Sequence, residues 1–170
     1  MPAIFAAHML AENLTPHQAY PKIRQYCAYQ NRCHSEVRSK LYDYGLHKND
    51  VEEIMSKLVE ENHLNEERFA INFAGGRFRI KHWGRVKIKY ELKQKQVSDY
   101  CIKKALDAID KPAYLKTFKK LADTKEKLLK SEKNIFTKKK KLHDYLRMKG
   151  YEPELIHSIP VTIIKKASRT

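Results

Sequence analysis

Residues 86 to 109 read VKIKYELKQKQVSDYCIKKALDAI, and their pattern distinguishes a helical fold from a β fold. The first seven residues alternate between apolar and charged side chains, as a half-buried β-strand does. The same apolar spacing recurs in two other segments, SEVRSKLYDYGLHKNDVEEIMSKL (35 to 58) and KKLHDYLRMKGYEPELIHSIPVTI (140 to 163). A pattern that recurs three times fixes the register better than a local alternation. We therefore interpret the stretch as part of an internal helical repeat.

Six apolar positions and one turn position align in the three segments. The first two apolar positions lie four residues apart, and the turn position, Gly45, Gln96 or Gly150, follows four residues later. This spacing is typical of a helix that ends at a residue in the left-handed conformation. The later positions follow the i, i+3, i+7 pattern of a second helix. The apolar sets are Val37/Ile88/Leu142, Leu41/Leu92/Leu146, Leu46/Val97/Tyr151, Val51/Ile102/Ile156, Ile54/Ala105/Ile159 and Leu58/Ile109/Ile163.

The middle segment carries a second apolar stripe, Val86 and Tyr90, where the other two segments have serine or charged residues. On a helix this stripe lies nearly opposite Ile88 and Leu92. A module packed between two neighbours needs apolar residues on both sides. The stripe therefore favours a tandem array over a β-strand.

Helix-start signals supply the remaining elements. Thr15, Pro16 and Gln18 form a capping box with Pro at the first helical position, which opens a helix through about Tyr29. Asn65 stands before two glutamates and starts another helix. Further starts are expected at Ser98, Lys111-Pro112, Thr137 and Pro153. The side chains assigned to the core of these helices are Phe69, Phe73, Phe78, Ile80, Tyr90, Leu115, Phe118, Leu121 and Leu128.

The expected fold class is all-α, with three tandem three-helix repeats in an elongated array, at residues 15–62, 65–110 and 111–165. The chain has only 5 Gly and 6 Pro against 32% charged residues, so it lacks the turn residues of an all-β sandwich. No apolar run of 18 residues is present, which excludes a membrane span.

The positive charge is concentrated in the second half of the chain. Residues 1–76 hold 8 basic and 10 acidic groups, whereas residues 77–150 hold 24 basic and 8 acidic groups, a balance of +16. Such asymmetry indicates a polyanionic partner, most often nucleic acid, because neutralising phosphates releases counterions. The alternative is that the lysines only form a solvated face.

Candidate binding residues follow from this segment. A base occurs every two or three residues along two consecutive expected helices, and a lysine run follows near residue 140. Trp83 is a candidate for stacking on a base, with wedging between helices as the alternative. Arg68 is assigned to a structural ion pair. The expected binding residues are Arg77, Arg79, Lys81, Arg85, Lys87, Lys89, Lys93, Lys95, Lys138, Lys139, Lys140, Lys141, Arg147 and Lys149.

Two stretches of the sequence resemble a known family of proteins. LNEERFAINFAGGRFRIKHWGRVKIKYELKQKQVSDYCIKKAL (64 to 106) is similar to the middle-repeat signature of the RecX regulatory proteins, and YCAYQNRCHSEVRSKLYDYGL (26 to 46) to their first repeat. The resemblance implies three tandem three-helix repeats that bind the RecA recombinase, lie in the groove of its filament and also bind DNA. It further implies inhibition of filament growth, ATP hydrolysis and strand exchange.

This chain departs from the family pattern in three places. Cys33 stands at a cap position where relatives often have Ser, Gln96 replaces the usual turn Gly, and the run from Lys138 to Lys141 is its own. The first two departures weaken a cap and a turn. Because the lysine run is not part of the family pattern, the resemblance does not predict which partner the third repeat contacts.

No catalytic arrangement stands out in the sequence. Gly75, Gly76 and Gly84 do not match a phosphate-binding loop, and close helix packing with a turn explains them better. Cys27, Cys33 and His34 could suggest zinc, but their spacing favours buried structural cysteines. We therefore expect no enzyme, no metal and no cofactor.

The expected setting and partners follow from these points. Three cysteines suit a reducing cytoplasm, and the opening MPAIFAAHML lacks the basic start of a secretory signal. The expected partners are the RecA filament and single- and double-stranded DNA, with no membrane. The alternative is an independent DNA-binding helical module that acts without the recombinase.

The charge predicts a steep salt dependence for DNA binding. If about six phosphates are neutralised, affinity should fall by about 10³-fold between about 50 and 200 mM salt, because counterion release drives the binding. Fluorescence anisotropy on a labelled oligonucleotide across this range measures the slope. A slope near zero would show that the lysines only solvate the surface.

Overall fold

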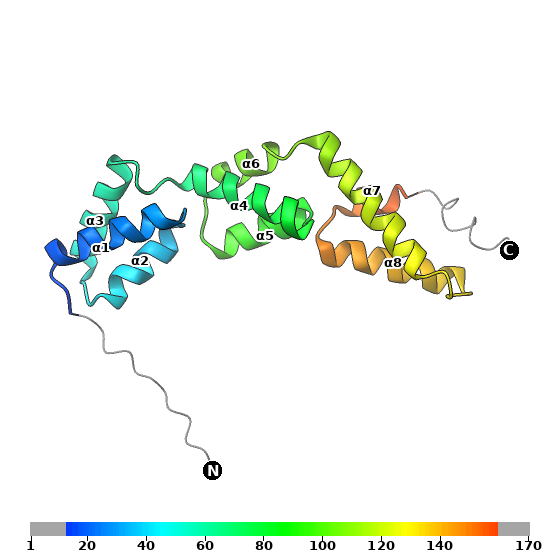
Figure 1. Ribbon diagram of the computed structural model, residues 1–170, viewed down its shortest axis with the longest axis horizontal. Coiled ribbons are helices and arrows are strands. Elements are labelled where there is room, and N and C mark those ends of the chain that lie inside the picture. Colours follow the sequence, from blue (N-terminus) through cyan, green and yellow to red (C-terminus); the bar gives the residue numbers. More distant parts are fainter. Residues whose placement is uncertain (1–12, 160–170) are drawn as a thin grey trace, which may run out of the picture. The chain divides into compact units, whose positions relative to one another are not determined.

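The computed structural model describes residues 13–159, and this range is helical with no strand (Figure 1). The all-α helical repeat fold expected from the sequence is confirmed. The described helices, in chain order, are α1 (Pro16–Tyr29), α2 (His34–Asp43), α3 (Lys48–Glu60), α4 (Glu66–Lys81), α5 (Arg85–Gln94), α6 (Asp99–Asp107), α7 (Lys111–Leu128), α8 (Ile135–Lys149) and α9 (Pro153–His157).

The aligned positions of the repeat behave alike in all three segments. Gly45, Gln96 and Gly150 have φ angles of 81°, 59° and 87°, so each ends its helix in the left-handed region. The six residues of the first two apolar sets are at most 1% exposed. Ile159 is half-buried, and Ile163 lies outside the described residues. The register read from the sequence is therefore confirmed.

Most of the expected helix starts are confirmed. The side chains of Thr15, Asn65 and Ser98 each accept a hydrogen bond from an amide three residues later. The start expected at Thr137 is wrong. Asn134 is the cap instead, because its Oδ1 accepts from the amides of Phe136 and Thr137 at 2.9 and 3.1 Å.

Two parts of the core were placed wrongly. Val86 and Tyr90 are 50% and 61% exposed, so the second stripe of α5 is not covered. Ile80 is exposed as well. The helix buries only the face that carries Ile88 and Leu92, because that side packs within its own repeat.

The buried face of α7 also differs from the expected one. Leu115 and Leu128 are exposed, and Leu121 is half-buried. Phe118 is buried as expected, and the residues buried with it are Tyr114 and Ala122. These three residues lie four apart, so the actual stripe is shifted from the leucines by about one residue.

The described residues form two compact units that divide between Phe69 and Ala70. Unit 1, residues 13–69, packs α1, α2 and α3 on a core that includes Ile23, Leu41 and Leu58. Unit 2, residues 70–159, contains the rest of α4 and α5 to α9, with α5 against α6 and α7 against α8 (Figure 1). The repeat boundaries 15–62, 65–110 and 111–165 stay a prediction.

Within unit 2, α5 begins without a side-chain cap of its own. Its N-cap residue is Gly84, and the amides of Gly84 and Val86 donate to the carbonyls of Lys149 and Gly150 at 2.8 and 3.0 Å. The intervening amide of Arg85 donates to the hydroxyl of Tyr114 at 3.0 Å. The end of α8 and a tyrosine of α7 thus satisfy amides that a helix start leaves unpaired. We call this contact the glycine junction.

Both glycines of the junction are required by space. A Cβ atom on Gly84 would overlap the carbonyl of Gly150, and a Cβ on Gly150 would overlap Lys87. Gly150 also needs its positive φ. Behind the junction the rings of Tyr114 and Tyr151 lie 5.2 Å apart, and the Tyr151 hydroxyl donates to the carbonyl of His82 at 3.3 Å.

We predict that Gly84→Ala destabilises unit 2 by about 2 to 4 kcal/mol, because the new methyl group forces the two backbones apart. Gly76→Ala is the matched control, since nothing lies within 4 Å of its Cβ position in the middle of α4. It should stabilise the protein by up to about 1 kcal/mol. Urea unfolding followed by circular dichroism measures both. Equal effects of the two substitutions on the free energy of unfolding would contradict the steric requirement for glycine at position 84.

Candidate nucleic-acid interface

The expected binding residues all lie in unit 2, on or beside α4, α5 and α8. Their surroundings differ, and the difference decides which of them can meet a phosphate. Five are exposed and form no ion pair with any carboxylate in residues 13–159. These five, which we call the free basic set, are Arg79, Lys81, Lys89, Lys139 and Lys140.

Three further cations are held in ion pairs at the surface. Lys93 lies 3.4 Å from Asp99, Lys141 lies 2.7 Å from Glu132, and Arg147 lies 3.6 Å from Asp144. The hydrogen bond from Lys141 lowers the pKa of Glu132. Exposed pairs of this kind contribute little to stability and open at low cost. These cations therefore remain able to turn toward an anionic partner.

Trp83 is half-buried between α4 and α5, and cations lie over its ring. The Lys87 ammonium is 4.7 Å and the Arg77 guanidinium 5.2 Å from the ring centroid. Cations in these positions are attracted by the indole ring. Lys87 also donates to the carbonyl of Met148 at 3.4 Å. This arrangement favours wedging between helices over base stacking.

Phe73 is half-buried, so its assignment to the core was wrong. It lies under Arg77 at 4.9 Å and Lys95 at 5.9 Å. Lys149, at the end of α8, donates to the carbonyl of Lys81 at 3.4 Å. Aromatic rings and backbone carbonyls of unit 2 thus hold several of the expected binding cations.

Lys138 does not belong in the interface. Its side chain is buried, with the residue only 3% exposed, and the ammonium lies 3.8 Å from Glu126 on α7. Burial raises the pKa of Glu126. A signal in the sequence could have found this, because Lys138 lies four and eight residues before the buried Leu142 and Leu146.

Arg85 also makes contacts within unit 2. Its guanidinium lies 4.5 Å from the Tyr114 ring, donates to the carbonyl of Ile109 at 3.5 Å and lies 4.0 Å from Glu152. The Tyr114 hydroxyl donates to Glu152 at 2.7 Å, and burial raises the pKa of Tyr114. Arg85 is therefore a component of the glycine junction, and nothing in the local sequence distinguishes it from its basic neighbours.

Arg68, in unit 1, has a structural role of a different kind from the one expected. It donates to Asn31 Oδ1 at 3.2 Å and to the backbone carbonyl of Asn62 at 3.0 Å. A further bond reaches the carbonyl of His63 at 3.4 Å. These acceptors are neutral oxygens, so the expected ion pair is wrong.

The cysteines fit the structural interpretation. Cys27, Cys33 and Cys101 are buried, and none of them is in a disulfide bond within residues 13–159. Burial raises the pKa of Cys27 to about 11, which disfavours the reactive thiolate. No group of three or more His, Cys, Asp or Glu side chains in residues 13–159 could hold a metal ion.

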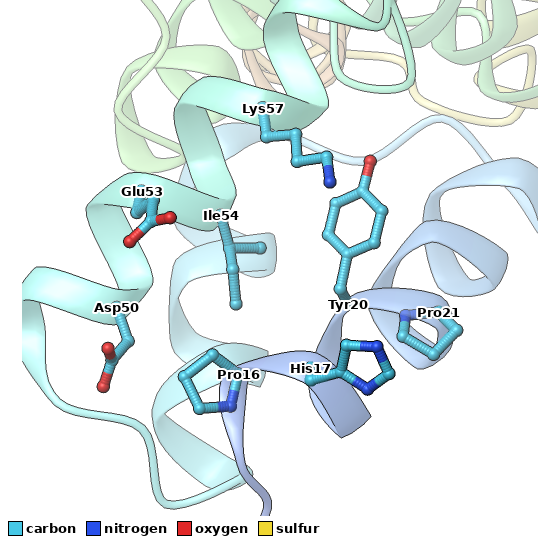
Figure 2. Close-up of a pocket in the computed structure, with 8 residues that line it drawn as sticks. All are labelled: Pro16, His17, Tyr20, Pro21, Asp50, Glu53, Ile54 and Lys57. Atoms are coloured by element: carbon cyan, nitrogen blue, oxygen red, sulfur yellow. The ribbon is translucent and has the colours of Figure 1, made fainter.

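Unit 1 has a pocket of about 420 Å³ between α1 and α3 (Figure 2). The Lys57 ammonium lies 4.3 Å from the centroid of the Tyr20 ring, whose hydroxyl donates to Glu61. Burial and this bond raise the pKa of Tyr20 to about 12. No described hydrogen bond joins His17 to Asp50 or Glu53, so the pocket shows no acid–base pair. Its lining residues are Pro16, His17, Tyr20, Pro21, Asp50, Glu53, Ile54 and Lys57.

Comparison with known proteins shows which family this chain belongs to. A family model described as RecX, second three-helix domain, matches residues 65–106. Regulatory protein RecX of Prosthecochloris aestuarii is 31% identical over 131 residues, which cover 77% of this chain and 83% of that relative. The chain belongs to the RecX family. The resemblance seen in the sequence is confirmed.

Two other RecX proteins show how far the similarity in sequence and in fold extends. Regulatory protein RecX of Clostridium perfringens is 34% identical over 125 residues, and the match spans 73% of this chain but 58% of that relative. The structure of RecX from Lactobacillus salivarius has the same fold, with a TM-score of 0.77 at 24% identity, covering 94% of this chain and 99% of that one.

None of the helices in residues 13–159 is both long and apolar enough to cross a membrane.

The RecX family model covers only part of the candidate interface. The matched segment includes Arg79, Lys81 and Lys89 of the free basic set and ends at residue 106. Lys139 and Lys140 lie beyond it, on α8. The basic surface of α4 and α5 is therefore the part of the candidate interface that lies within the matched residues.

The two kinds of arginine predict different effects of substitution. Arg85→Ala should destabilise unit 2 by about 2 kcal/mol, because it removes the ring contact and leaves Glu152 without its cation. Arg79→Ala should change stability by less than about 0.5 kcal/mol, since its guanidinium is exposed. Thermal unfolding of the two variants measures the difference. A larger loss from Arg79→Ala would contradict the assignment.

Proposed function

We propose that this RecX protein is a non-enzymatic regulator of the RecA recombinase that binds the recombinase–DNA filament through the basic surface of unit 2. The observation that carries the proposal is the free basic set on a member of a family of regulatory proteins. In the proposed mechanism the protein bridges neighbouring recombinase protomers and the DNA they coat. It inhibits filament extension, ATP hydrolysis and strand exchange, and it acts in the cytoplasm.

Electrostatics supports a polyanionic partner for unit 2. Arg79, Lys81 and Lys89 present charges that no described carboxylate neutralises, so binding a phosphate breaks no internal ion pair. The Arg79 guanidinium suits bidentate contact with a phosphate or a carboxylate, whereas the lysines act as point charges. The same cations can therefore meet single-stranded DNA, double-stranded DNA or acidic groups of the recombinase.

The glycine junction supports a preorganised surface. It joins the start of α5 to the end of α8 through backbone hydrogen bonds of 2.8 and 3.0 Å. Cations on α5 and α8 are then presented from elements that are already in place before a partner binds. Binding to such a surface loses less conformational entropy than binding to loose segments.

A pair of matched variants tests the proposal. ATP hydrolysis by the recombinase on single-stranded DNA is titrated with the wild-type protein, with Arg79→Ala/Lys89→Ala and with Arg24→Ala/Lys48→Ala. Each variant loses one guanidinium and one ammonium from exposed positions, but the second pair lies in unit 1. The first variant should need about tenfold more protein for half-inhibition, and the second should match the wild type.

Two results would contradict the proposal. If the wild-type protein leaves ATP hydrolysis unchanged but still binds DNA, the chain is an independent DNA-binding module. If both variants lose inhibition equally, total charge matters and the surface of unit 2 does not. Arg85 is left unchanged because its loss would disturb the fold.

A further inference from the structure

The outward face of α5 combines an exposed aromatic ring with positive charge. Tyr90 is 61% exposed, and Val86, one turn earlier, is 50% exposed. Lys87 and Lys93 lie three residues before and after Tyr90, so they flank it on the helix surface. Glu91 is the one acidic residue among the ten of α5, against four basic ones. This surface therefore offers a ring in a positive environment.

The ring of Tyr90 is also unoccupied. No ring or cation within residues 13–159 stacks against it, whereas Trp83 has Lys87 and Arg77 over its ring at 4.7 and 5.2 Å. Tyr100 is the nearest equivalent on α6, with 64% exposure, but the Lys104 ammonium lies 5.5 Å from its centroid. Tyr90 is thus an exposed ring of unit 2 whose face is open to a partner.

We propose that Tyr90 is a stacking platform for an unpaired base and gives the α5 surface a preference for single-stranded over double-stranded DNA. The proposal rests on the proposed function, because it assumes that unit 2 meets nucleic acid. Aromatic rings stack on any base, so the contact requires no particular sequence. Bases in a duplex are already stacked on one another, so only a single strand can offer a face to Tyr90.

The neighbouring charges fit this occupant. Lys89 is free, and Lys93 is released by opening an exposed ion pair with Asp99. Lys93, one turn after Tyr90, can contact a phosphate beside a base stacked on the ring. Lys89, next to Tyr90 in the chain, adds positive charge to the same helix. Val86 extends the apolar surface beneath the base. An apolar protein partner would instead have to bury the cations of α5 beside its own contact, which is costly without acidic partners.

The test compares DNA affinities of the full chain and three variants. Fluorescence anisotropy measures binding of the wild type, Tyr90→Ala, Tyr90→Phe and Tyr100→Ala to labelled oligothymidylate and to a duplex of the same length. Tyr90→Ala should weaken single-strand binding by about tenfold and leave duplex binding within about twofold. Tyr90→Phe and Tyr100→Ala should stay within about twofold of the wild type.

The salt dependence supplies a second readout. Tyr90 carries no charge, so Tyr90→Ala should lower the affinity without changing the slope of affinity against salt, whereas Lys89→Ala should make the slope shallower. Circular dichroism of each variant checks that the fold is kept.

Four outcomes would overturn the inference. Unchanged single-strand affinity in Tyr90→Ala would show that the ring does not stack, while the proposed function would stand. Equal losses on single strand and duplex would show a contact that does not depend on unpaired bases. Unchanged DNA affinity together with weaker inhibition of the recombinase would show that α5 contacts protein. If the wild type binds no DNA at all, the DNA part of the proposed function fails along with the inference.

Discussion

The first amides of α5 donate to the last carbonyls of α8, and the packing of unit 2 depends on this contact. Gly84 brings no side-chain cap, so the backbone of Lys149 and Gly150 takes that place at 2.8 and 3.0 Å. The positive end of one helix dipole thereby meets the negative end of another. Because a side chain on either glycine would collide with the opposite backbone, the contact forms only between two glycines. It joins segments more than 60 residues apart in the chain into one unit.

The junction also explains why cations that look alike in the sequence have different roles. Arg85 packs on Tyr114 and faces Glu152, and Lys87 donates to Met148, so both take part in holding unit 2 together. Lys138 does the same between α7 and α8 through Glu126. Arg79 and Lys89 have no such partner among the described carboxylates. Net positive charge alone therefore does not separate cations that stabilise the fold from cations that are available to a partner, whereas the ion pairs and hydrogen bonds within the protein do.

The sequence predicted the repeat because its signals are local and redundant. Six aligned apolar positions and a turn residue agree in three segments, and Gln96 adopts the left-handed conformation that glycine has in the other two. Individual side chains were harder to place. Val86 and Tyr90 carry the residue types of a buried stripe yet are exposed, because burial depends on which neighbour covers a face. The structural role of Arg85 could not be predicted, because its partners lie 24 to 67 residues away in the chain. The burial of Lys138 could have been predicted from its four-residue spacing to Leu142.

We propose that the recombinase filament contacts the basic surface of α4 and α5. Acetylation footprinting with mass spectrometry tests it most directly, by comparing lysine reactivity in the free protein and in the protein bound to recombinase on single-stranded DNA. We expect Lys81 and Lys89 to lose reactivity on binding, while Lys48, an exposed lysine of unit 1, keeps it. Protection of Lys48 with unchanged reactivity of Lys81 and Lys89 would show that the filament does not contact this surface.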